Sequence, residues 1–290
     1  MVIGRDFIGP FQLLRMIRSG TTTQVWEGLR TGEKKRIALK ILLRDYRKDQ
    51  NEIRQLKHEA LVGAELKNPH VIRIFGYHED QGNPLLAMEL STARNLKQVL
   101  REQPELINAN IGPVIRGAAQ GLQHLHSKGW VHCDVKPDNF LADDEAHIKL
   151  IDFSIAVKAR KPKKGLAKLF SVKSKQAAGT RSYMAPEQIR REALDIRCDI
   201  YGLGCVIFEL LAKRTPFSGN SPDDLLNRHL HQNPPSLEAV SDASKEFAAM
   251  VKKMMAKDRD ERYQDMHHFL SDLAKTEIYK AGKRPEGYRK

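Results

Sequence analysis

HCDVKPDNFL, at residues 132–141, is soon followed along the chain by the carboxylate of Asp152. Asp134 can accept or orient a hydroxyl proton, and Lys136 can neutralise a phosphate beside it. Asn139 and Asp152 offer oxygen atoms, which are the ligands that Mg²⁺ prefers. Phosphoryl transfer depends on positioning and on neutralising negative charge rather than on covalent help from the protein. This stretch of sequence therefore favours a phosphoryl-transfer site.

The part of the chain before this stretch alternates short β-like runs with one helix. Apolar residues recur every three to four positions from Ile53 to Ala64, which predicts an amphipathic helix. The helix is expected to end at Asn68-Pro69, because the residue before a proline is pushed out of the α region. Strands are predicted at 11–17, 25–29, 36–42, 71–77 and 85–90.

The part after Ser91 is mostly helical. One apolar face runs from Ile111 to Leu125, and Gly129 is expected to close that helix. Short strands are predicted at 139–141 and 147–151, and further helices at 195–212, 222–231, 244–256 and 266–275. The predicted fold class is α+β and bilobal, with a β-rich N-terminal lobe that holds one main helix and an α-rich C-terminal lobe. The chain is expected to cross between them near Glu89–Arg94.

The composition is that of a soluble globular protein, with 41% hydrophobic and 29% charged residues. No apolar run approaches the ~20 residues that a membrane helix needs, so no membrane span is expected. Met1–Pro10 lacks the apolar core of a secretory signal. Three cysteines form no disulfide framework or metal motif. These features together predict a cytoplasmic location.

The formal net charge of +13 leaves several interpretations open. The excess of basic residues fits a nucleic-acid, acidic-lipid or acidic-protein partner, and it equally fits a solvated surface with basic tails. A nucleic-acid binder would need aromatic or groove-reading elements beside the charge, and the aromatic residues fall mostly at core-like positions. We therefore expect no nucleic-acid partner.

Several motifs in their order along the chain resemble the eukaryotic-type (Hanks-type) Ser/Thr protein kinase family. HCDVKPDNFL resembles its catalytic loop, and IDF at 151–153 resembles the start of its activation segment. IALK at 37–40 is similar to the strand that bears the phosphate-binding lysine, and GTRSYMAPE at 179–187 to the end of the activation segment. The resemblance covers nearly the whole chain, and the small Gly63 is similar to bacterial members.

The resemblance implies a protein kinase domain at 11–274 that uses ATP and Mg²⁺. Its limits would be an N-lobe at about 11–88, a hinge at 89–94 and a C-lobe at 95–274, followed by a basic tail at 275–290. Lys136 and Thr180 match the Ser/Thr branch of the family, so the implied substrates are serine and threonine hydroxyls of proteins.

The resemblance also implies roles for individual residues. The implied catalytic residues are Asp134, Lys136, Lys40 and Glu59, and the implied metal ligands are Asn139 and Asp152. Glu52 and Glu65 share a helix with Glu59, but Glu59 has the family spacing to Pro69 and shares a helix face with Leu56 and Ala60. The implied nucleotide-binding residues are Ile17, Arg18, Ser19, Gly20, Thr21, Thr22, Thr23, Gln24, Val25, Ala38, Lys40, Met88, Glu89, Leu90 and Leu141.

Structural roles are implied for other residues of the C-lobe. Glu187 resembles the partner of Arg262 in a buried ion pair that fixes the activation segment. Asp199 resembles the residue that ties down the catalytic-loop backbone, and His132 and Phe153 resemble members of the apolar stack of the family. The basic tail after Lys275 is expected to be a fraying end or linker.

Three positions depart from the family pattern. The glycine-rich loop at 18–25 keeps only Gly20, so ATP binding is expected to be weaker. Cys133 replaces the arginine that receives an activation-segment phosphate in many kinases. We therefore hypothesise that activity does not strictly depend on phosphorylation there. Ser154 replaces the glycine that follows IDF, which is expected to restrict the motion of Asp152.

The basic stretch Lys158–Lys175 has three open interpretations. It is a solvated disordered loop, a docking site for an acidic substrate or partner, or a substitute receiver for phosphate on Ser171, Ser174 or Thr180. The main alternative function for the whole chain is a pseudokinase or scaffold, which the degenerate loop and Cys133 favour. A small-molecule kinase is a second alternative, but GTRSYMAPE belongs to protein-substrate machinery.

Overall fold

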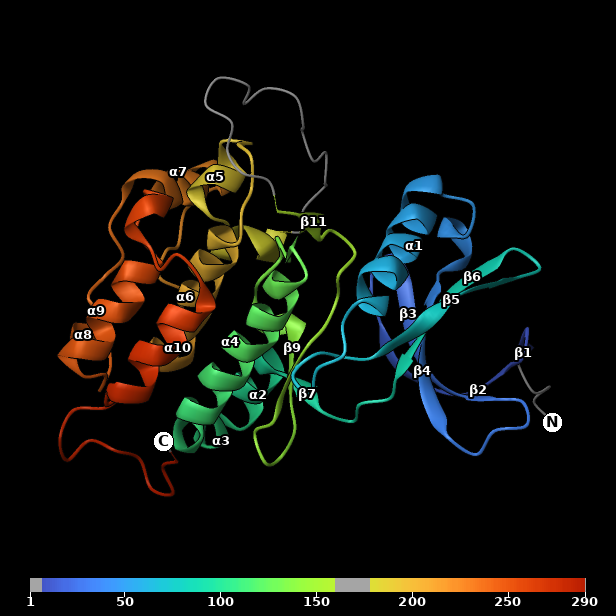
Figure 1. Ribbon diagram of the computed structural model, residues 1–290, viewed down its shortest axis with the longest axis horizontal. Helices are drawn as coiled ribbons and strands as arrows, with labels where there is room; N and C mark the ends of the chain where they lie inside the picture. The colour runs from blue at the N-terminus through green and yellow to red at the C-terminus, as the bar shows by residue number, and fades with distance from the viewer. Residues whose placement is uncertain (1–6, 160–177, 290) are drawn as a thin grey trace. The chain divides into compact units, whose positions relative to one another are not determined.

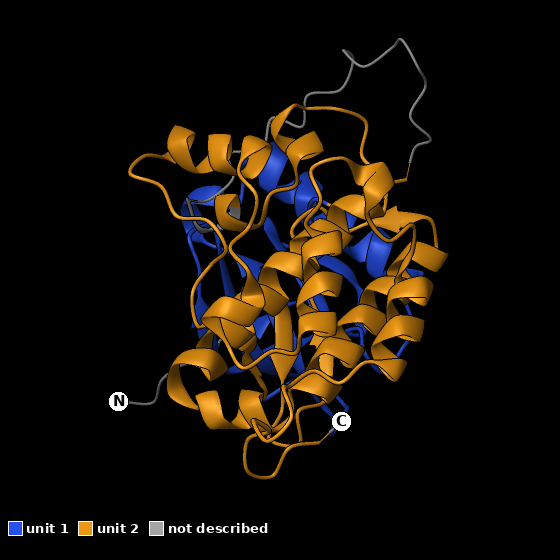
Figure 2. Ribbon diagram, turned by 90° about the vertical axis from the view of Figure 1, so that its left-hand side faces the viewer, with its two compact units in different colours: residues 1–92, 152–155 blue, residues 93–151, 156–290 orange. Residues whose placement is uncertain are grey.

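The computed structural model describes residues 7–159 and 178–289. The chain divides into two compact units, which Figure 2 colours separately. The first unit comprises Met1–Thr92 and Asp152–Ile155, and the second comprises Ala93–Ile151 and Ala156–Lys290. A short piece that is distant in sequence is thus part of the first unit.

The first unit is built on a six-stranded antiparallel sheet and one long helix, α1 (Gln50–Ala64) (Figure 1). The strand order is β1-β2-β3-β4-β6-β5. The strands are β1 (Phe7–Ile8), β2 (Phe11–Ser19), β3 (Thr23–Arg30), β4 (Arg36–Leu42), β5 (Ile74–Asp80) and β6 (Asn83–Glu89), and a 3-10 turn spans Arg44–Tyr46.

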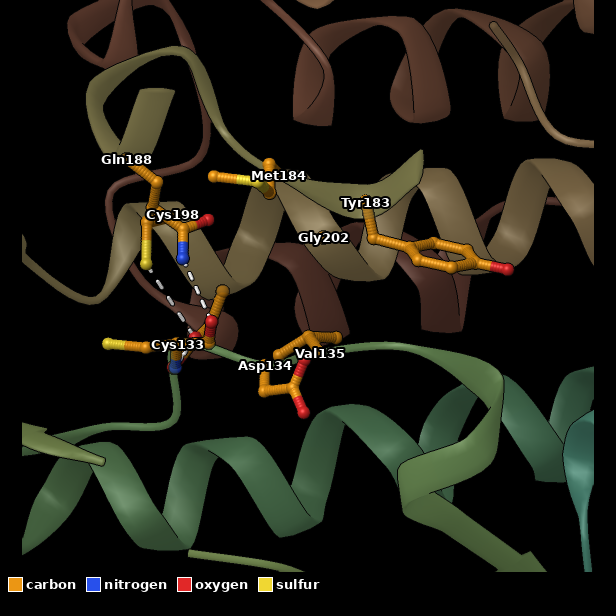
Figure 3. Close-up of a pocket in the computed structure, with 9 residues that line it drawn as sticks. Cys133, Asp134, Val135, Tyr183, Met184, Gln188, Cys198 and Gly202 are labelled. Atoms are coloured by element: carbon orange, nitrogen blue, oxygen red, sulfur yellow. Dashed lines mark hydrogen bonds between the residues drawn. The ribbon is translucent and has the colours of Figure 1, made fainter. Parts of the chain in front are cut away.

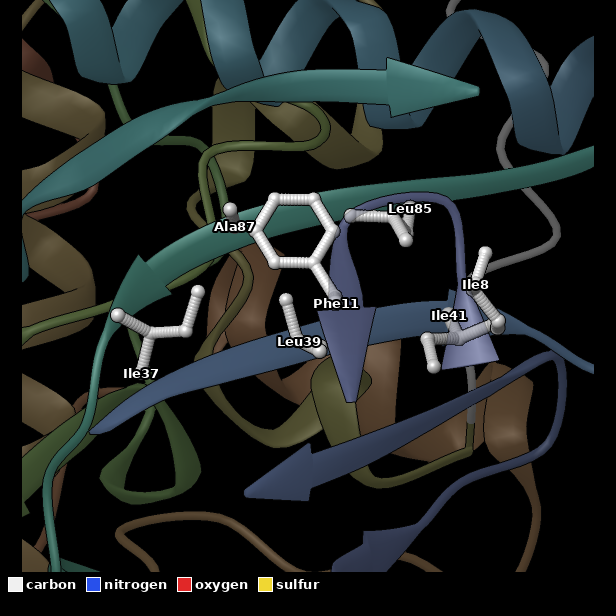
Figure 4. Close-up of a cluster of buried hydrophobic side chains, with 7 residues drawn as sticks. All are labelled: Ile8, Phe11, Ile37, Leu39, Ile41, Leu85 and Ala87. Carbon is white, nitrogen blue, oxygen red and sulfur yellow. The ribbon is translucent and has the colours of Figure 1, made fainter. Parts of the chain in front are cut away.

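Strand β4 shows how the sheet separates core from chemistry. Side chains alternate between the two faces of a strand, so Ile37, Leu39 and Ile41 share one face and Lys40 points to the other. The three apolar residues pack with Phe11 in a buried cluster, completed by Ile8, Leu85 and Ala87 (Figure 4). This cluster fixes β4 and so fixes the direction of Lys40.

Helix α1 approaches strand β5 closely because Gly63 has no side chain. A Cβ atom at Gly63 would lie 2.2 Å from Cγ1 of Ile74, which is far inside van der Waals contact. Asp49 caps the helix by accepting hydrogen bonds from the amides of Asn51 and Glu52. The predicted end at Asn68-Pro69 is wrong: α1 ends at Ala64, where the chain turns to bury Leu66.

The second unit is mainly helical. Its helices are α2 (Leu96–Glu102), α3 (Pro104–Ala109), α4 (Ile111–Ser127), α5 (Pro186–Ile189), α6 (Arg197–Ala212), α7 (Pro222–His231), α8 (Leu237–Val240), α9 (Lys245–Met254) and α10 (Met266–Lys275). Short strands pair in the order β10-β9-β7 and β11-β8. They are β7 (Arg94–Asn95), β8 (Trp130–Val131), β9 (Phe140–Ala142), β10 (Ile148–Leu150) and β11 (Val157–Lys158), and 3-10 turns span Pro137–Asn139, Ala178–Tyr183 and Arg259–Glu261.

Helix α6 forms the centre of this unit. It is apolar on nearly all sides, and every residue from Cys198 to Leu211 is buried, as expected for a helix without a polar face. The predicted apolar face of α4 is also buried, and Gly129 follows the helix with a φ of 74°. The predicted α+β fold class, with one main helix in the β-rich part, is confirmed. Among the described residues, no helix has the length and apolar character needed to cross a membrane.

The expectation that the C-terminal tail frays is wrong. Ile278 and Tyr279 are buried, and the hydroxyl of Tyr279 donates to the carbonyl of Asn108 at 3.1 Å. Further on, the amide of Arg289 donates to the carbonyl of Ala109 at 2.7 Å. The low apolar content of the segment concealed these few anchoring residues.

Candidate active site

Lys40 lies between two carboxylates of the first unit. Its Nζ is 2.7 Å from Oε2 of Glu59 on α1 and 3.5 Å from Oδ1 of Asp152. Burial alone would lower the pKa of Lys40, but the charges of Asp152 and Glu59 outweigh burial and hold that pKa above its ordinary value. The lysine is therefore an ammonium group with a fixed direction, suited to holding an anion.

Asp152 is held in place by its own backbone and by Ser154. Its φ of 66° is in the left-handed region, which side-chain-bearing residues seldom adopt. The Ser154 hydroxyl donates to Oδ1 of Asp152 at 2.7 Å, and the Ser154 amide donates to the same oxygen at 3.3 Å. Such local strain persists only where neighbours determine the conformation, and it concentrates at functional sites.

The predicted nucleotide-binding loop is the turn between β2 and β3. The amide of Gly20 donates to the carbonyl of Thr23 at 2.8 Å, and the amide of Leu43 donates to that of Thr22 at 2.8 Å. The φ of Gly20 is not in the left-handed region, but a Cβ there would lie 3.3 Å from the Thr23 carbonyl oxygen. Glycine is thus favoured by close packing rather than by a positive φ.

Other predicted nucleotide-binding residues lie on adjacent strands of the same sheet. Val25 pairs with Lys40, and Ala38 pairs with Met88. Ala38 is buried, whereas Ile17 is 41% exposed. Leu141 lies in the second unit, on β9, where it pairs with Lys149. The remaining predicted positions occupy the ends of the strands: Arg18 and Ser19 on β2, Thr21 in the turn, Gln24 on β3, Glu89 at the end of β6, and Leu90 directly after it.

Only one of the two carboxylate oxygens of Asp134 accepts hydrogen bonds from described residues. Oδ2 accepts hydrogen bonds from Nζ of Lys136 at 2.7 Å and from Nδ2 of Asn139 at 2.9 Å. Oδ1 is buried and has no hydrogen-bond partner among residues 7–159 and 178–289. A buried carboxylate oxygen without a donor is costly unless a ligand supplies one. Oδ1 is therefore the oxygen of Asp134 to which no described residue donates.

The backbone around Asp134 is fixed by Asp199 of α6. The amides of His132 and Cys133 donate to the two oxygens of Asp199 at 2.7 and 2.9 Å, and Nε2 of His126 lies 2.8 Å from Oδ2. Cys133 has a φ of 66°, another left-handed residue that is not glycine. The predicted role of Asp199 in tying down this backbone is confirmed.

Helix α5 fixes the other side of this loop. Nε2 of Gln188 donates to the carbonyl of Cys133 at 2.8 Å. Glu187 beside it forms a two-pronged, fully buried ion pair with Arg262, at 2.7 and 2.9 Å. The predicted Glu187–Arg262 pair is therefore present.

Gln188 and His126 also support the site directly, and neither was predicted from the sequence to do so. Gln188 directly follows the motif APE, which could have drawn attention to it. His126 and Asp199 are far apart in sequence, and no local pattern connects them.

Asn139 and Asp152 each carry oxygen atoms of a kind that a divalent cation prefers. The amide nitrogen of Asn139 is committed to the carbonyl and the carboxylate of Asp134, at 2.8 and 2.9 Å. The amide oxygen is therefore the atom of Asn139 that can serve as a ligand. Asp152, in the first unit, offers a carboxylate, and oxygen atoms of either kind suit Mg²⁺.

Most of the predicted basic stretch lies outside the described residues, as do Ser171, Ser174 and the side chain of Thr180. Lys158 is described, and it is engaged within its own unit. Its Nζ lies 3.9 Å from the centre of the Trp130 ring and 3.1 Å from the carbonyl of Lys128. Lys158 thus contacts its own unit through an exposed side chain.

Comparison with known proteins places this geometry in context. The family model described as "Protein kinase domain" matches residues 11–272. The probable serine/threonine-protein kinase PknB of Bifidobacterium longum is 30% identical over 276 residues, covering 91% of this chain and 39% of that protein. PknH of Mycobacterium bovis is 32% identical over 259 residues, covering 89% and 42%. PknL of Mycobacterium tuberculosis is 31% identical over 258 residues, covering 89% and 63%. The chain thus spans about two fifths of the length of the first two relatives and less than two thirds of the third.

Proposed function

The chain belongs to the protein kinase domain family, and we propose that it transfers the γ-phosphate of ATP to serine or threonine hydroxyls of proteins. The observation that carries this proposal is the carboxylate of Asp134, in which Lys136 and Asn139 hold one oxygen and no described residue donates to the other. We propose a domain at 11–274 with a hinge at 89–94. We also propose a reducing compartment such as the cytoplasm, because all three cysteines are free.

Asp134 acts on the acceptor in this proposal. Oδ1, to which no described residue donates, takes the hydroxyl proton while the acceptor oxygen bonds to phosphorus. Lys136 and Asn139 hold Oδ2 at 2.7 and 2.9 Å, so the carboxylate cannot rotate away. Lys136 also places a positive charge next to the transferred phosphoryl group, on which negative charge develops in the transition state.

Lys40 acts on the nucleotide. The pair with Glu59 at 2.7 Å keeps the ammonium in one direction, so it can hold two phosphate groups without reorganising. Asn139 and Asp152 are the proposed ligands of Mg²⁺, which when bound neutralises phosphate charge. The adenine-binding positions proposed are Val25, Ala38 and Leu141, with backbone groups of Glu89 and Leu90.

The proposed reaction is tested with labelled ATP. We expect the purified chain with Mg²⁺ to transfer labelled γ-phosphate to itself and to a generic basic protein. Asp134→Asn should abolish transfer while ATP binding, measured by calorimetry, is retained. Asp144→Asn is the matched control, because Asp144 is 90% exposed on the turn between β9 and β10. No transfer by the unaltered chain despite ATP binding would refute the proposal and favour the scaffold alternative.

We also propose that activity does not require phosphate on the activation segment. Cys133 stands at the position of the phosphate-receiving arginine, and it already lies in a backbone geometry held by Asp199 and Gln188. Phosphatase-treated and untreated protein should therefore transfer phosphate at the same rate. A loss of activity after treatment would contradict this proposal.

A docking role for the basic stretch is a separate proposal. We propose it for the basic residues of Lys158–Lys175, of which Lys158 contacts the Trp130 ring. Reversing the charges of Lys163, Lys164 and Lys168 should weaken phosphorylation of an acidic protein substrate and leave ATP binding unchanged. An unchanged rate for such a substrate would count against docking.

A further inference from the structure

Cys133 and Cys198 meet beside the proposed catalytic base, although they are far apart in sequence. Both line a small pocket together with Asp134, Met184 and Gln188 (Figure 3). The amide of Cys133 lies 2.9 Å from Oδ1 of Asp199, and Sγ of Cys198 lies 3.7 Å from the same oxygen. The neighbouring Cys133 side chain and burial both raise the pKa of the Cys198 thiol. The two cysteines therefore lie beside each other, against the same oxygen of Asp199.

We propose that Cys133 and Cys198 form a disulfide when the protein meets hydrogen peroxide, and that this bond switches the active site off. The loss of activity rests on the proposed kinase function, whereas formation of the bond does not. Cys205, the third cysteine, lies further along α6 and is also buried, so it offers a control within the same helix.

Cys133 is the cysteine that reacts first. It lines the pocket next to Asp134 and is 7% exposed, whereas Cys198 is 2% exposed. The neighbouring Cys133 side chain and burial both raise the pKa of Cys198, which makes its thiol a weak nucleophile. This difference assigns Cys133 as the attacking thiol and Cys198 as the resolving thiol.

The chemistry balances in two steps. The sulfur of Cys133 attacks one peroxide oxygen, an S–O bond forms, the O–O bond breaks, and hydroxide leaves with the thiol proton as water. The sulfur of Cys198 then attacks the sulfur of Cys133, the S–S bond forms, and the S–O bond breaks. The leaving hydroxyl takes the proton of Cys198 as a second water. Two thiols are oxidised and one peroxide is reduced to two waters.

The disulfide acts on catalysis through the loop backbone. An S–S bond of about 2.05 Å is shorter than any non-bonded contact between two sulfur atoms, so the bond pulls Cys133 toward α6. Cys133 directly precedes Asp134, and its amide and carbonyl are the groups held by Asp199 and Gln188. Displacing this peptide moves the Asp134 carboxylate from the position set by Lys136 and Asn139.

The test exposes the full chain to hydrogen peroxide and follows two quantities. Peptide mass spectrometry without reduction should show the Cys133 and Cys198 peptides joined, with a mass about 2 Da below their sum. Phosphate transfer should fall about tenfold or more and return with dithiothreitol. Cys205→Ser should respond like the unaltered chain. Cys198→Ser, and Cys198→Ala as a second variant, should form no joined peptide. Any activity that these variants lose to peroxide should not return with dithiothreitol.

The proposal is overturned if the joined peptide is absent after peroxide treatment. It is also overturned if the Cys198 variants lose activity reversibly to the same extent as the unaltered chain. The joined peptide is measured independently of phosphate transfer. Failure of the cysteine pair and failure of the proposed kinase function are therefore distinguishable.

Discussion

Ser154 donates its hydroxyl hydrogen to the same carboxylate oxygen of Asp152 that faces Lys40, with an O···O distance of 2.7 Å. Glycine at this position, as in most of the family, would leave that oxygen without this donor. Serine at position 154 therefore has less backbone freedom than glycine, and its hydroxyl holds the carboxylate of Asp152 in place.

Ser154→Ala should lower phosphate transfer about tenfold, because a hydrogen bond to a charged group contributes about 1.5 kcal/mol or more. The Mg²⁺ concentration for half-maximal activity should rise as well, since the proposed ligand Asp152 becomes mobile. A magnesium titration at saturating ATP measures both effects. Ser154→Thr keeps the hydroxyl and should restore the magnesium dependence. Equal curves for Ser154→Ala and the unaltered chain would show that the hydroxyl does not position Asp152.

Glu59→Gln should reduce transfer by about tenfold to a hundredfold, because Lys40 loses a charged partner at 2.7 Å. The substitution conserves shape, so the unfolding transition should stay cooperative. Steady-state kinetics with ATP as the varied substrate checks the first expectation. Glu52→Gln, on the first turn of the same helix, is the control and should behave like the unaltered chain. Similar losses in both variants would mean that a general effect on α1 is responsible.

Acid should destabilise the second unit through His229. This imidazole is fully buried with Nδ1 2.9 Å from the hydroxyl of Tyr201, and burial, together with the charge of Lys257, lowers its pKa to about 3. Between pH 6.5 and 3 the unfolded chain binds a proton that the folded chain does not. The free energy of unfolding should therefore fall with pH, by about 1.4 kcal/mol for each unit below about 6.5.

Urea unfolding at pH 7 and pH 5 measures this contribution. His229→Asn keeps a polar atom near Nδ1 and removes the titrating ring, so its stability should change less between the two pH values. His231→Asn, at the exposed end of α7, is the control. If His229→Asn retains the full pH dependence, other groups account for it.

Enlarging Gly63 should separate α1 from β5. Gly63→Ala places a methyl group 2.2 Å from Ile74 in the present geometry, and overpacking of this kind costs about 1–3 kcal/mol. Ile74→Ala alone leaves a cavity and is also destabilising. The double variant should lose less unfolding free energy than the two single variants lose together, by about 1 kcal/mol or more. Additive losses in urea unfolding would show that the two residues do not constrain each other.

The sequence was most informative where chemistry and local periodicity coincide. The predicted strand 36–42 contained Lys40, and family spacing selected Glu59 from Glu52, Glu59 and Glu65. The structure brings Lys40 and Glu59 together at 2.7 Å. Their roles in phosphate binding stay predictions.

The sequence was least informative where contacts join distant segments. Cys133 and Cys198 lie beside each other because Asp199 of α6 holds the backbone of His132 and Cys133. No local pattern in the sequence predicts that contact. The tail at 275–290 has few apolar residues, but Ile278 and Tyr279 suffice to anchor it. Helices α2 and α3 are separated only by Gln103, and the proline that starts α3 at Pro104 marks a boundary that periodicity alone does not show.

The assignment of Asp152–Ile155 to the first unit has a consequence for engineering. A chimera that exchanged only Met1–Thr92 with a relative would combine the lysine of one parent with the carboxylate of the other. Ser154, which holds that carboxylate, would also come from the unexchanged parent. The first unit therefore cannot be transferred as one continuous segment. Both Met1–Thr92 and Asp152–Ile155 must be exchanged together, because the shorter piece carries the Asp152 partner of Lys40.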